Sequence, residues 1–327
     1  MSEKNRIIIL IPIYDDWKSF EILLHHLDAE FQGSEWEIDL LVIDDGSQTS
    51  HENHGFSLTA LKGISKVSVL RLRRNLGHQR AIALGLTYIE MNLQCRAVLI
   101  MDGDGEDTPA EARRLIEKCV AENFSKLIFA RRTKRSESLP FRLSYLFYRN
   151  FYRILTGKTF RFGNFSVVPS VFLSRLSVIS EGWNHYASSV LKAKIPYTEI
   201  DTARGARHTG QSKMNFTSLI IHGLSSISVY AELVGVRMLI ATFLLTAVST
   251  ILIGIVVAVR FFTDLAIPGW ATFAVGLLIL ILLQSVSLSL FFSFIVLGGR
   301  DTATFLPQRD YHYFIAYNYQ LYPQSEK

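Results

Sequence analysis

The chain has 327 residues, of which 49% are hydrophobic and 19% are charged, and the apolar excess lies almost wholly beyond residue 236. This distribution excludes an ordinary soluble chain and is typical of one α/β domain followed by a membrane segment. The formal net charge of +5 is thinly spread, so we expect phosphate groups and anionic lipids as partners and no nucleic acid. Cys95 and Cys119 form no Cys-x-x-Cys pair, which predicts no disulfide framework and a large domain in the cytosol.

Short apolar runs alternate with helical stretches from residue 6 to about residue 131. Runs that are apolar on both faces are typical of buried parallel strands, so the pattern predicts a doubly wound, mostly parallel sheet with flanking helices. Ligands of such sheets bind beyond the carboxyl ends of the strands, and the residues that follow each strand are therefore the candidates for a site. The predicted strands are Ile7–Ile13, Ile38–Ile43, Val67–Leu72, Ala97–Met101 and Leu127–Ala130, and the predicted helices are Asp15–Asp28, Gly77–Asn92 and Pro109–Glu122.

Two amphipathic segments follow this alternating region. Residues 140–157 place aromatic side chains at helical spacing and interleave them with Arg142, Arg149 and Arg153. A helix that lies in a lipid interface has this pattern, and so has a helix that packs on the core of its own domain; the sequence leaves both open. Residues 216–236 repeat the pattern in a milder form and predict a juxtamembrane helix after a domain that spans residues 1–215.

Two uncharged apolar segments near the C-terminus are long enough to cross a bilayer. Met238–Val259 has about 22 residues and Trp270–Leu297 about 28, whereas a bilayer core needs roughly 20. Residues 237–299 therefore predict a transmembrane hairpin that returns the chain to the side from which it came. Basic residues gather at its base while Arg260 alone lies in its tip, which predicts a cytoplasmic large domain and a cytoplasmic tail over residues 300–327. The basic residues at the base are Arg204, Arg207, Lys213, Arg237, Arg300 and Arg309.

An acidic loop, Asp102-Gly103-Asp104-Gly105-Glu106, follows the strand that ends at Met101. Three carboxylates this close repel one another unless a cation lies among them, and Mg²⁺ or Mn²⁺ with a diphosphate is the expected partner. The alternative is a solvated turn that caps the next helix, although Asp107 and Thr108 are better placed for capping.

A second acidic turn, Asp44-Asp45-Gly46-Ser47, follows another strand at the same predicted edge. One of its carboxylates is suited to accept a hydrogen bond from a base N–H or a ribose hydroxyl, while Gly46 permits the tight turn. Asp-Gly is ordinary turn chemistry by itself, so this turn has weight only together with the other motifs.

Four motifs in order resemble family 2 glycosyltransferases of the GT-A fold, in the branch that includes dolichyl-phosphate mannose synthase and bacterial polyprenyl-phosphate glycosyltransferases. They are Ile11-Pro12-Ile13-Tyr14-Asp15-Asp16, Val42-Ile43-Asp44-Asp45-Gly46-Ser47, Asn75-Leu76-Gly77-His78-Gln79 and Asp102-Gly103-Asp104. The resemblance covers most of residues 6–235, and a C-terminal transmembrane hairpin also occurs in this branch. It implies a GT-A type, mostly parallel α/β sheet with flanking helices, followed by amphipathic interfacial helices and the hairpin, in a bacterial inner membrane.

The resemblance also implies roles for individual residues. Nucleotide-sugar contacts are expected at Pro12, Tyr14, Asp16, Asp44, Asp45, Asp102, Gly103 and Arg131; metal ligands at Asp102, Asp104 and Glu106; acceptor-phosphate contacts at Arg207, Ser212 and Lys213. Of these, Asp102, Asp104, Arg131, Arg207 and Lys213 would carry catalysis. Gln often stands where this chain has Glu106, which leaves the choice between Mg²⁺ and Mn²⁺ open. Arg207 and Lys213 have a plainer alternative as juxtamembrane charges that hold anionic lipid.

The expected acceptor follows from a difference between this chain and family members that glycosylate a hydroxyl. Family members that glycosylate a hydroxyl often carry a Glu-Asp pair as general base, and residues 180–185 contain none, although Glu181 or His185 remains an alternative base or sugar contact. A lipid monophosphate is already anionic at neutral pH and needs no base. We therefore expect inverting transfer from a UDP- or GDP-sugar to a polyprenyl or dolichyl phosphate at the cytoplasmic membrane face.

Three further possibilities stay open, and one is disfavoured. A lipid hydroxyl as acceptor and a non-catalytic membrane scaffold of the same fold are the alternatives, and a homo-oligomer is left open. A nicotinamide enzyme is disfavoured because no Gly-x-Gly-x-x-Gly follows the first strand.

Overall fold

The computed structural model describes residues 5–49, 60–132, 149–158, 162–209, 216–263, 269–301 and 305–323. The chain divides into two compact units. Residues 1–142, 160–229 and 304–327 form an α/β unit, and residues 143–159 and 230–303 form a helical unit. Each unit is considered by itself below.

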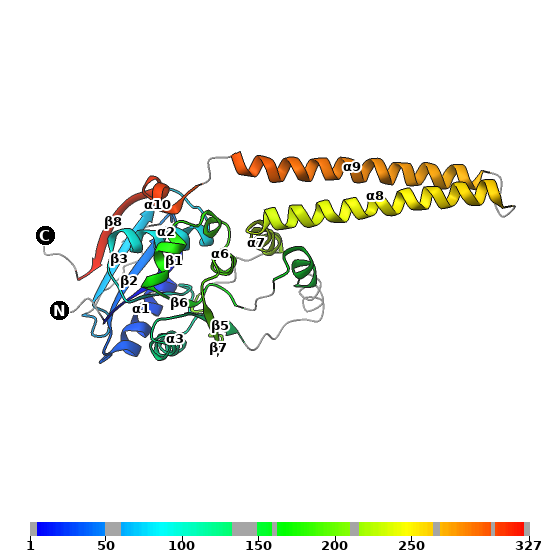
Figure 1. Ribbon diagram of the computed structural model, residues 1–327. Helices are drawn as coiled ribbons and strands as arrows, with labels where there is room; N and C mark the ends of the chain where they lie inside the picture. Colours follow the sequence, from blue (N-terminus) through cyan, green and yellow to red (C-terminus); the bar gives the residue numbers. More distant parts are fainter. Residues whose placement is uncertain are drawn as a thin grey trace. The chain divides into compact units, whose positions relative to one another are not determined.

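The α/β unit is built on one eight-stranded sheet with the order β7-β5-β6-β4-β1-β2-β3-β8 (Figure 1). The four adjacent strands β3, β2, β1 and β4 run parallel, and β7 is parallel to β5. Strand β6 is antiparallel to β4 and β5, and β8 is antiparallel to β3, so the sheet is mixed but mostly parallel. The strands are β1 (Arg6–Ile13), β2 (Glu37–Asp44), β3 (Lys66–Leu72), β4 (Ala97–Ile100), β5 (Leu127–Arg132), β6 (Ser166–Pro169), β7 (Tyr197–Thr202) and β8 (Ile315–Tyr322).

Helices cover both faces of the sheet because successive side chains of each strand point to opposite faces. Ile7 and Ile9 of β1 join a buried cluster with α1 (Trp17–Phe31) and α3 (Pro109–Ala121). Ile8 of the same strand joins a second cluster with the helices of the other face. These are α2 (His78–Asn92), α5 (Leu173–Ser177) and α6 (Tyr186–Lys192).

Each predicted strand and helix between residues 6 and 131 is confirmed, with ends that differ by at most three residues. Thr108 is the N-cap of α3, and its Oγ1 accepts a hydrogen bond from the backbone N–H of Glu111 at 3.4 Å. The expected tail over residues 300–327 contains β8, which pairs with the edge strand β3. Short helices precede β8 and follow β6: η3 (Ser170–Phe172), η4 (Ser180–Trp183), α10 (Pro307–Asp310) and η5 (Tyr311–Phe314).

Helix α7 (Phe216–Ser228) ends the second segment of the α/β unit. Its Ser226 is buried and shares a hydrogen bond of 2.8 Å with Ser188 of α6. Ile221 and Leu224, by contrast, are each 58% exposed. The helix therefore packs with a polar side inward and leaves an apolar side uncovered.

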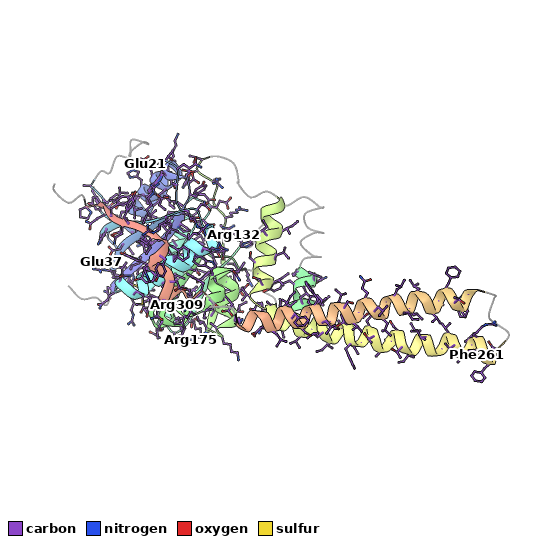
Figure 2. The ribbon with its side chains drawn as sticks, turned by 90° about the horizontal axis from the view of Figure 1, so that it is seen from above. Glu21, Glu37, Arg132, Arg175, Phe261 and Arg309 are labelled. Atoms are coloured by element: carbon purple, nitrogen blue, oxygen red, sulfur yellow. The ribbon has the colours of Figure 1, made fainter. Side chains whose placement is uncertain are left out.

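The helical unit contains two long antiparallel helices, α8 (Ala231–Phe262) and α9 (Trp270–Asp301), which lie side by side (Figure 1). Both are long and apolar enough to cross a membrane: the mean hydropathy is 2.5 over an 18-residue stretch of Ala231–Phe262 and 2.4 over an 18-residue stretch of Trp270–Ile295. Thr242 and Ser289 share a hydrogen bond between the two helices. The remaining surface is largely exposed apolar side chains, such as Phe261 near the turn (Figure 2).

Half of the predicted interfacial helix at residues 140–157, namely residues 140–148, lies outside the described residues. Residues 149–156 are helical. There the Ile154 carbonyl accepts a hydrogen bond of 2.7 Å from Arg237.

Candidate active site at the carboxyl edge of the sheet

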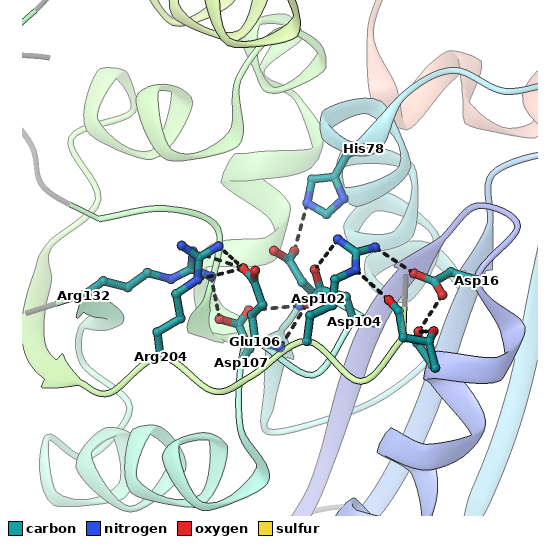
Figure 3. A network of polar contacts seen from close by, with 11 residues as sticks. Asp16, His78, Asp102, Asp104, Glu106, Asp107, Arg132 and Arg204 are labelled. Carbon is teal, nitrogen blue, oxygen red and sulfur yellow. Dashed lines mark hydrogen bonds and ion pairs between the residues drawn. The ribbon is translucent and has the colours of Figure 1, made fainter. Parts of the chain in front are cut away.

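The candidate site lies where β1, β2 and β4 end. The parallel register pairs Ile13 with Asp44 and Leu10 with Ile100, so the segments that follow these strands meet at one edge. Five carboxylates lie there, Asp16 before α1 and four within residues 102–107, and they face Arg132, Arg204, Arg207 and His78 (Figure 3). The sequence had predicted this edge from the positions of the acidic motifs alone.

The turn after β2 is held by its own carboxylates. Asp45 accepts hydrogen bonds from the backbone N–H groups of Leu76 and Gly77, at 2.7 and 2.8 Å, and so fixes the start of α2. Burial raises the pKa of Asp45, and these two hydrogen bonds oppose the rise. Asp44 is fully buried and lies 3.4 Å from the Arg71 guanidinium. Both side chains thus shape the turn from beneath.

Gly46 has a specific structural reason to be glycine. Its φ is +71°, and a Cβ at this position would lie 2.6 Å from the backbone carbonyl carbon of Arg74. Only a residue without a side chain allows the turn after β2 to approach the segment before α2 this closely.

The acidic loop is braced from inside by Asp107. Its Oδ2 accepts a hydrogen bond from the backbone N–H of Asp102 at 3.0 Å, and its Oδ1 lies 3.0 Å from the Arg132 guanidinium. Asp107 is only 2% exposed, and burial together with the neighbouring Asp102 raises its pKa to about 7 although Arg132 opposes the rise. The carboxyl group of Asp107 therefore fixes the loop rather than facing solvent.

A second segment, residues 203–209, runs alongside this loop and is called the basic arm here. The backbone N–H of Gly205 donates to the Glu106 carbonyl at 2.8 Å, and that of His208 donates to the Asp104 carbonyl at 2.9 Å. A Cβ at Gly105, where φ is +88°, would lie 2.3 Å from the His208 ring. The two segments are thus in direct backbone contact.

The arginines of the basic arm neutralise the acids of the site. Arg207 lies 3.1 Å from Asp16 and 3.3 Å from Asp104, and Arg204 donates through Nε to Glu106 at 2.9 Å. Burial raises the pKa of Asp104, with Arg207 opposing the rise. Guanidinium groups are suited to phosphoryl oxygens, so these two arginines are candidates for contact with a diphosphate.

His78 at the start of α2 pairs with the first acid of the loop. Its Nε2 lies 3.1 Å from Oδ1 of Asp102. Desolvation disfavours the charged form of both groups. The attraction between the two groups outweighs this effect of desolvation. The pKa of His78 is raised by Asp102, and the pKa of Asp102 is lowered by His78, with Arg132 and Arg204 adding to the effect.

The sequence model of the family described as glycosyl transferase family 2 matches residues 8–183. The chain belongs to glycosyltransferase family 2. The matched segment begins within β1 and ends with η4, and it therefore contains both acidic motifs.

Similar proteins are found along most of this family 2 chain. The uncharacterized glycosyltransferase YkcC of Bacillus subtilis is 24% identical in an alignment of 301 residues that covers 86% of this chain and 88% of that protein. The undecaprenyl-phosphate 4-deoxy-4-formamido-L-arabinose transferase of Klebsiella pneumoniae is 25% identical over 222 residues, 66% of this chain and 64% of that protein.

A solved structure with a similar fold is the glucosyl-3-phosphoglycerate synthase of Mycobacterium tuberculosis, in complex with Mn²⁺, UDP and phosphoglyceric acid. It superposes with a TM-score of 0.50 at 12% identity, over 71% of this chain and 79% of that one. The α/β unit of this family 2 member therefore has the GT-A type fold, as predicted.

Sequence reasoning missed Arg132 in this glycosyltransferase. Arg131, the predicted phosphate contact, pairs instead with β7, 2.6 Å from Asp201 and 3.6 Å from Glu199. Arg132 reaches the acidic loop, 3.0 Å from Asp107. Adjacent residues of a strand point to opposite faces, so alternation along β5 was the signal that distinguishes the two arginines.

The remaining predicted residues lie in different places. Pro12 is buried within β1, and Tyr14 follows that strand half-buried at the same edge. Ser212 and Lys213 lie outside the described residues. Sequence reasoning used Arg204 only as a basic residue at the base of the hairpin and gave His208 no role of its own, because the neighbours of both in space depend on the path of the basic arm.

The two candidate bases are both engaged elsewhere. Glu181 lies 2.5 Å from Lys192, and although burial acts in the other direction, this contact lowers its pKa. His185 is 4% exposed and caps α6, because its Nδ1 accepts from the backbone N–H of Ser188 at 3.2 Å. Burial and the neighbouring His222 lower the pKa of His185 to about 3.

The family implies a divalent cation, and the donor atoms at this edge are of the type that such a cation prefers. Asp102 and Asp104 offer carboxylate oxygens, which Mg²⁺ and Mn²⁺ prefer. Glu106 is held by Arg204, and nowhere in the described ranges do three Asp, Glu, His or Cys side chains converge as metal ligands. His208 adds a buried Nε2 without a hydrogen-bond partner among those residues.

Proposed function

We propose that this glycosyltransferase moves a sugar from a UDP- or GDP-linked donor to a polyprenyl phosphate, with inversion at the anomeric carbon. One observation carries the proposal: the basic arm presents Arg204 and Arg207 directly to the acidic loop 102–107, at the edge of the sheet where ligands of such folds bind. Guanidinium groups beside carboxylates provide the positive charge and the cation ligands that a leaving nucleoside diphosphate requires.

Donor binding would use both charges of the site. Asp102 and Asp104 would hold Mg²⁺ or Mn²⁺, with Glu106 or His208 as further donors, and the ion would stabilise negative charge on the leaving diphosphate. Arg132, Arg204 and Arg207 would turn from their present carboxylate partners to phosphoryl oxygens. Asp45, Asp16 and Tyr14 would border the base and ribose. Catalysis would then rest on positioning and on electrostatic stabilisation of the leaving group.

A phosphate acceptor is favoured over a hydroxyl by the state of the candidate bases. Glu181 is paired with Lys192, and His185 is used as a helix cap. A hydroxyl acceptor profits from a base that removes its proton, whereas a lipid monophosphate is already anionic. The name of the similar Klebsiella pneumoniae protein, an undecaprenyl-phosphate sugar transferase, supports the same choice.

We further propose that α8 and α9 span the membrane and that the α/β unit is cytoplasmic. The charge bias around the hairpin supports this orientation. Because residues 1–142, 160–229 and 304–327 belong to one unit, the chain must leave and re-enter on the same side, as two spans require. The uncovered apolar side of α7, with Ile220, Ile221 and Leu224, suits contact with lipid.

The proposal is tested with protein reconstituted in liposomes that contain either undecaprenyl phosphate or undecaprenol. A panel of UDP- and GDP-sugars with Mn²⁺ is supplied, and lipid products are identified by mass spectrometry. We expect a glycosylated lipid only with the phosphate. A product from undecaprenol or diacylglycerol would establish the hydroxyl alternative instead. No product with any donor, together with no calorimetric binding of UDP or GDP, would establish the scaffold.

A further inference from the structure

An outward-facing stripe of α9 carries the one amide side chain of the two apolar spans. Neither Met238–Val259 nor Trp270–Leu297 contains another Asn or Gln besides Gln284, which lies close to the middle of the span Trp270–Ile295. The neighbouring Ser285 is 1% exposed and faces α8, whereas Gln284 is exposed. The amide thus lies at mid-span on a surface that α8 does not cover.

Three serine hydroxyl groups of α9 make hydrogen bonds within the helix, and the Gln284 amide does not. Ser285, Ser287 and Ser293 each donate to the carbonyl four residues earlier, at 2.7 to 2.9 Å. Within the described part of the chain the Gln284 amide makes no hydrogen bond. A lipid tail offers neither donor nor acceptor, so an amide at this depth is stable only if another polar group meets it in the membrane.

The residues around Gln284 form a stripe with alternating steps of four and three residues. This spacing keeps two helices in contact over several turns, and a single polar residue in such a seam fixes register and partner. We call this set the Gln284 stripe; all its members are exposed: Phe273, Leu277, Leu280, Gln284, Ser287, Phe291 and Phe294.

We propose that the Gln284 stripe is the contact between two copies of this chain in the membrane. An amide is both donor and acceptor, so two of them satisfy each other when they meet. Copies inserted in one orientation carry Gln284 at the same depth, and a two-fold axis along the membrane normal brings identical stripes together. A second copy therefore supplies the missing partner without any other protein. The inference rests on insertion of the hairpin and is independent of the transfer chemistry.

Disulfide cross-linking in native membranes tests the stripe. Both natural cysteines, Cys95 and Cys119, lie in the α/β unit, so a cysteine added to α9 reports on the hairpin alone. We expect copper-phenanthroline to produce dimers from cysteines at positions 280, 284 and 287. Matched controls are positions 283, 286 and 290, which are exposed on the adjoining side of α9. Equal dimer yields on both sides would overturn the proposal.

A quantitative test uses the amide itself. Energy transfer between labelled chains in liposomes should show Gln284→Leu weakening association about 3- to 30-fold, while Gln284→Asn retains most of it. Moving the amide one turn along the stripe, in Gln284→Leu with Leu280→Gln, should restore association. Moving it off the stripe, in Gln284→Leu with Leu283→Gln, should not. An unchanged association constant for Gln284→Leu contradicts the proposal, whereas restoration by both double variants would show that position on α9 is irrelevant.

Insertion and catalysis are checked on the same samples. Resistance of the wild-type protein to carbonate extraction establishes that the hairpin is in the bilayer. Sugar transfer is measured in parallel, so a failure of the proposed activity is seen separately from a failure of association.

Discussion

His78 Nε2 lies 3.1 Å from Asp102 Oδ1, which links the first residue of α2 to the first acid of the loop after β4. The pKa of Asp102 is lowered by this imidazolium in spite of desolvation. A residue of one motif therefore stabilises the ionised form of an acid in another motif, more than twenty positions away in the sequence.

Replacing His78 by Gln should make the enzyme more sensitive to acid. Without the imidazolium the pKa of Asp102 rises, so protonation of a carboxylate that acts in its ionised form begins at a higher pH. The acidic limb of the kcat/KM profile, measured between pH 4 and 7, should move upward in pH. His25→Gln, at an exposed position on α1, should leave the profile in place, and an unmoved limb in His78→Gln would remove Asp102 from the titration.

Substitutions of the two neighbouring arginines of β5 should differ sharply in their effect on sugar transfer. Arg132→Gln removes a cation from the acidic loop and frees Asp107, so we expect transfer to fall by about 100-fold, the loss seen when one group that stabilises a leaving charge is removed. Arg131→Gln breaks only exposed pairs with Glu199 and Asp201 and should stay within about threefold of wild type. Steady-state kinetics with the donor varied provide the comparison. Equal losses of transfer in both variants would support Arg131 as the nucleotide-sugar contact that the sequence predicted.

Asp104 and Glu106 should respond differently to loss of charge. Asp104→Asn should lower transfer about 100-fold or more and abolish its dependence on Mn²⁺ concentration, with membrane insertion intact. Glu106→Gln removes a carboxylate that is already held by Arg204 and should keep transfer within about tenfold, still responsive to Mn²⁺. Titration of activity with Mn²⁺ distinguishes the two; wild-type behaviour of Asp104→Asn would count against any metal at this loop.

Acid should destabilise the α/β unit through His185. The pKa of this side chain is about 3 in the folded protein because of burial and His222, against about 6.5 when unfolded. The unfolded chain therefore binds a proton first, and stability is full above about pH 6.5 and declines toward pH 3, by up to about 1.4 kcal/mol per pH unit.

His185→Asn should flatten this decline, because Asn caps α6 equally well and carries no charge. Thermal unfolding in detergent at pH 5 and at pH 7.5 measures the difference. His25→Asn, at an exposed position, serves as the control. A decline in His185→Asn as steep as in the wild type would assign the acid sensitivity to another group.

The last strand should be required for a stable sheet. Leu321 is 6% exposed in the cluster beneath α1 and α3, so Leu321→Asp should cost about 3 kcal/mol of unfolding free energy. Ala316→Asp places the same charge on an exposed position of β8 and should cost under about 0.5 kcal/mol. Chemical denaturation compares the two variants, and similar midpoints would mean that β8 contributes little.

The sequence could predict the central fold because its signals are local. The both-face apolar runs of β1, β2 and β4 each predict a buried strand, and the acids that follow them predict the edge of the site. The role of Arg132 depended on a one-residue register within β5. Arg207 was predicted as a residue of the site, but the contacts of the basic arm with Glu106 and Asp16 could not be predicted, since they join residues that are about 100 to 190 positions apart.

Strand β8 shows how a clear local signal can be hidden by its surroundings. Its sequence, Ile315-Ala316-Tyr317-Asn318-Tyr319-Gln320-Leu321-Tyr322, is rich in residues that favour strands. It follows two apolar spans, however, and a segment beyond a membrane anchor suggests a tail. Its partner, β3, lies almost 250 positions earlier, a pairing that no local pattern encodes.

The position of β8 after α9 also has a consequence for biosynthesis. A ribosome releases the chain from its N-terminus at roughly 5 to 20 residues per second, so β1 to β7 emerge before either apolar helix, and β8 emerges only after both. Until then the free edge of β3 is open to pairing with other chains. The sheet is therefore completed only after translation has passed the membrane anchor. A chain that stops early in α9 would keep an unpaired β3 edge and would be prone to aggregate.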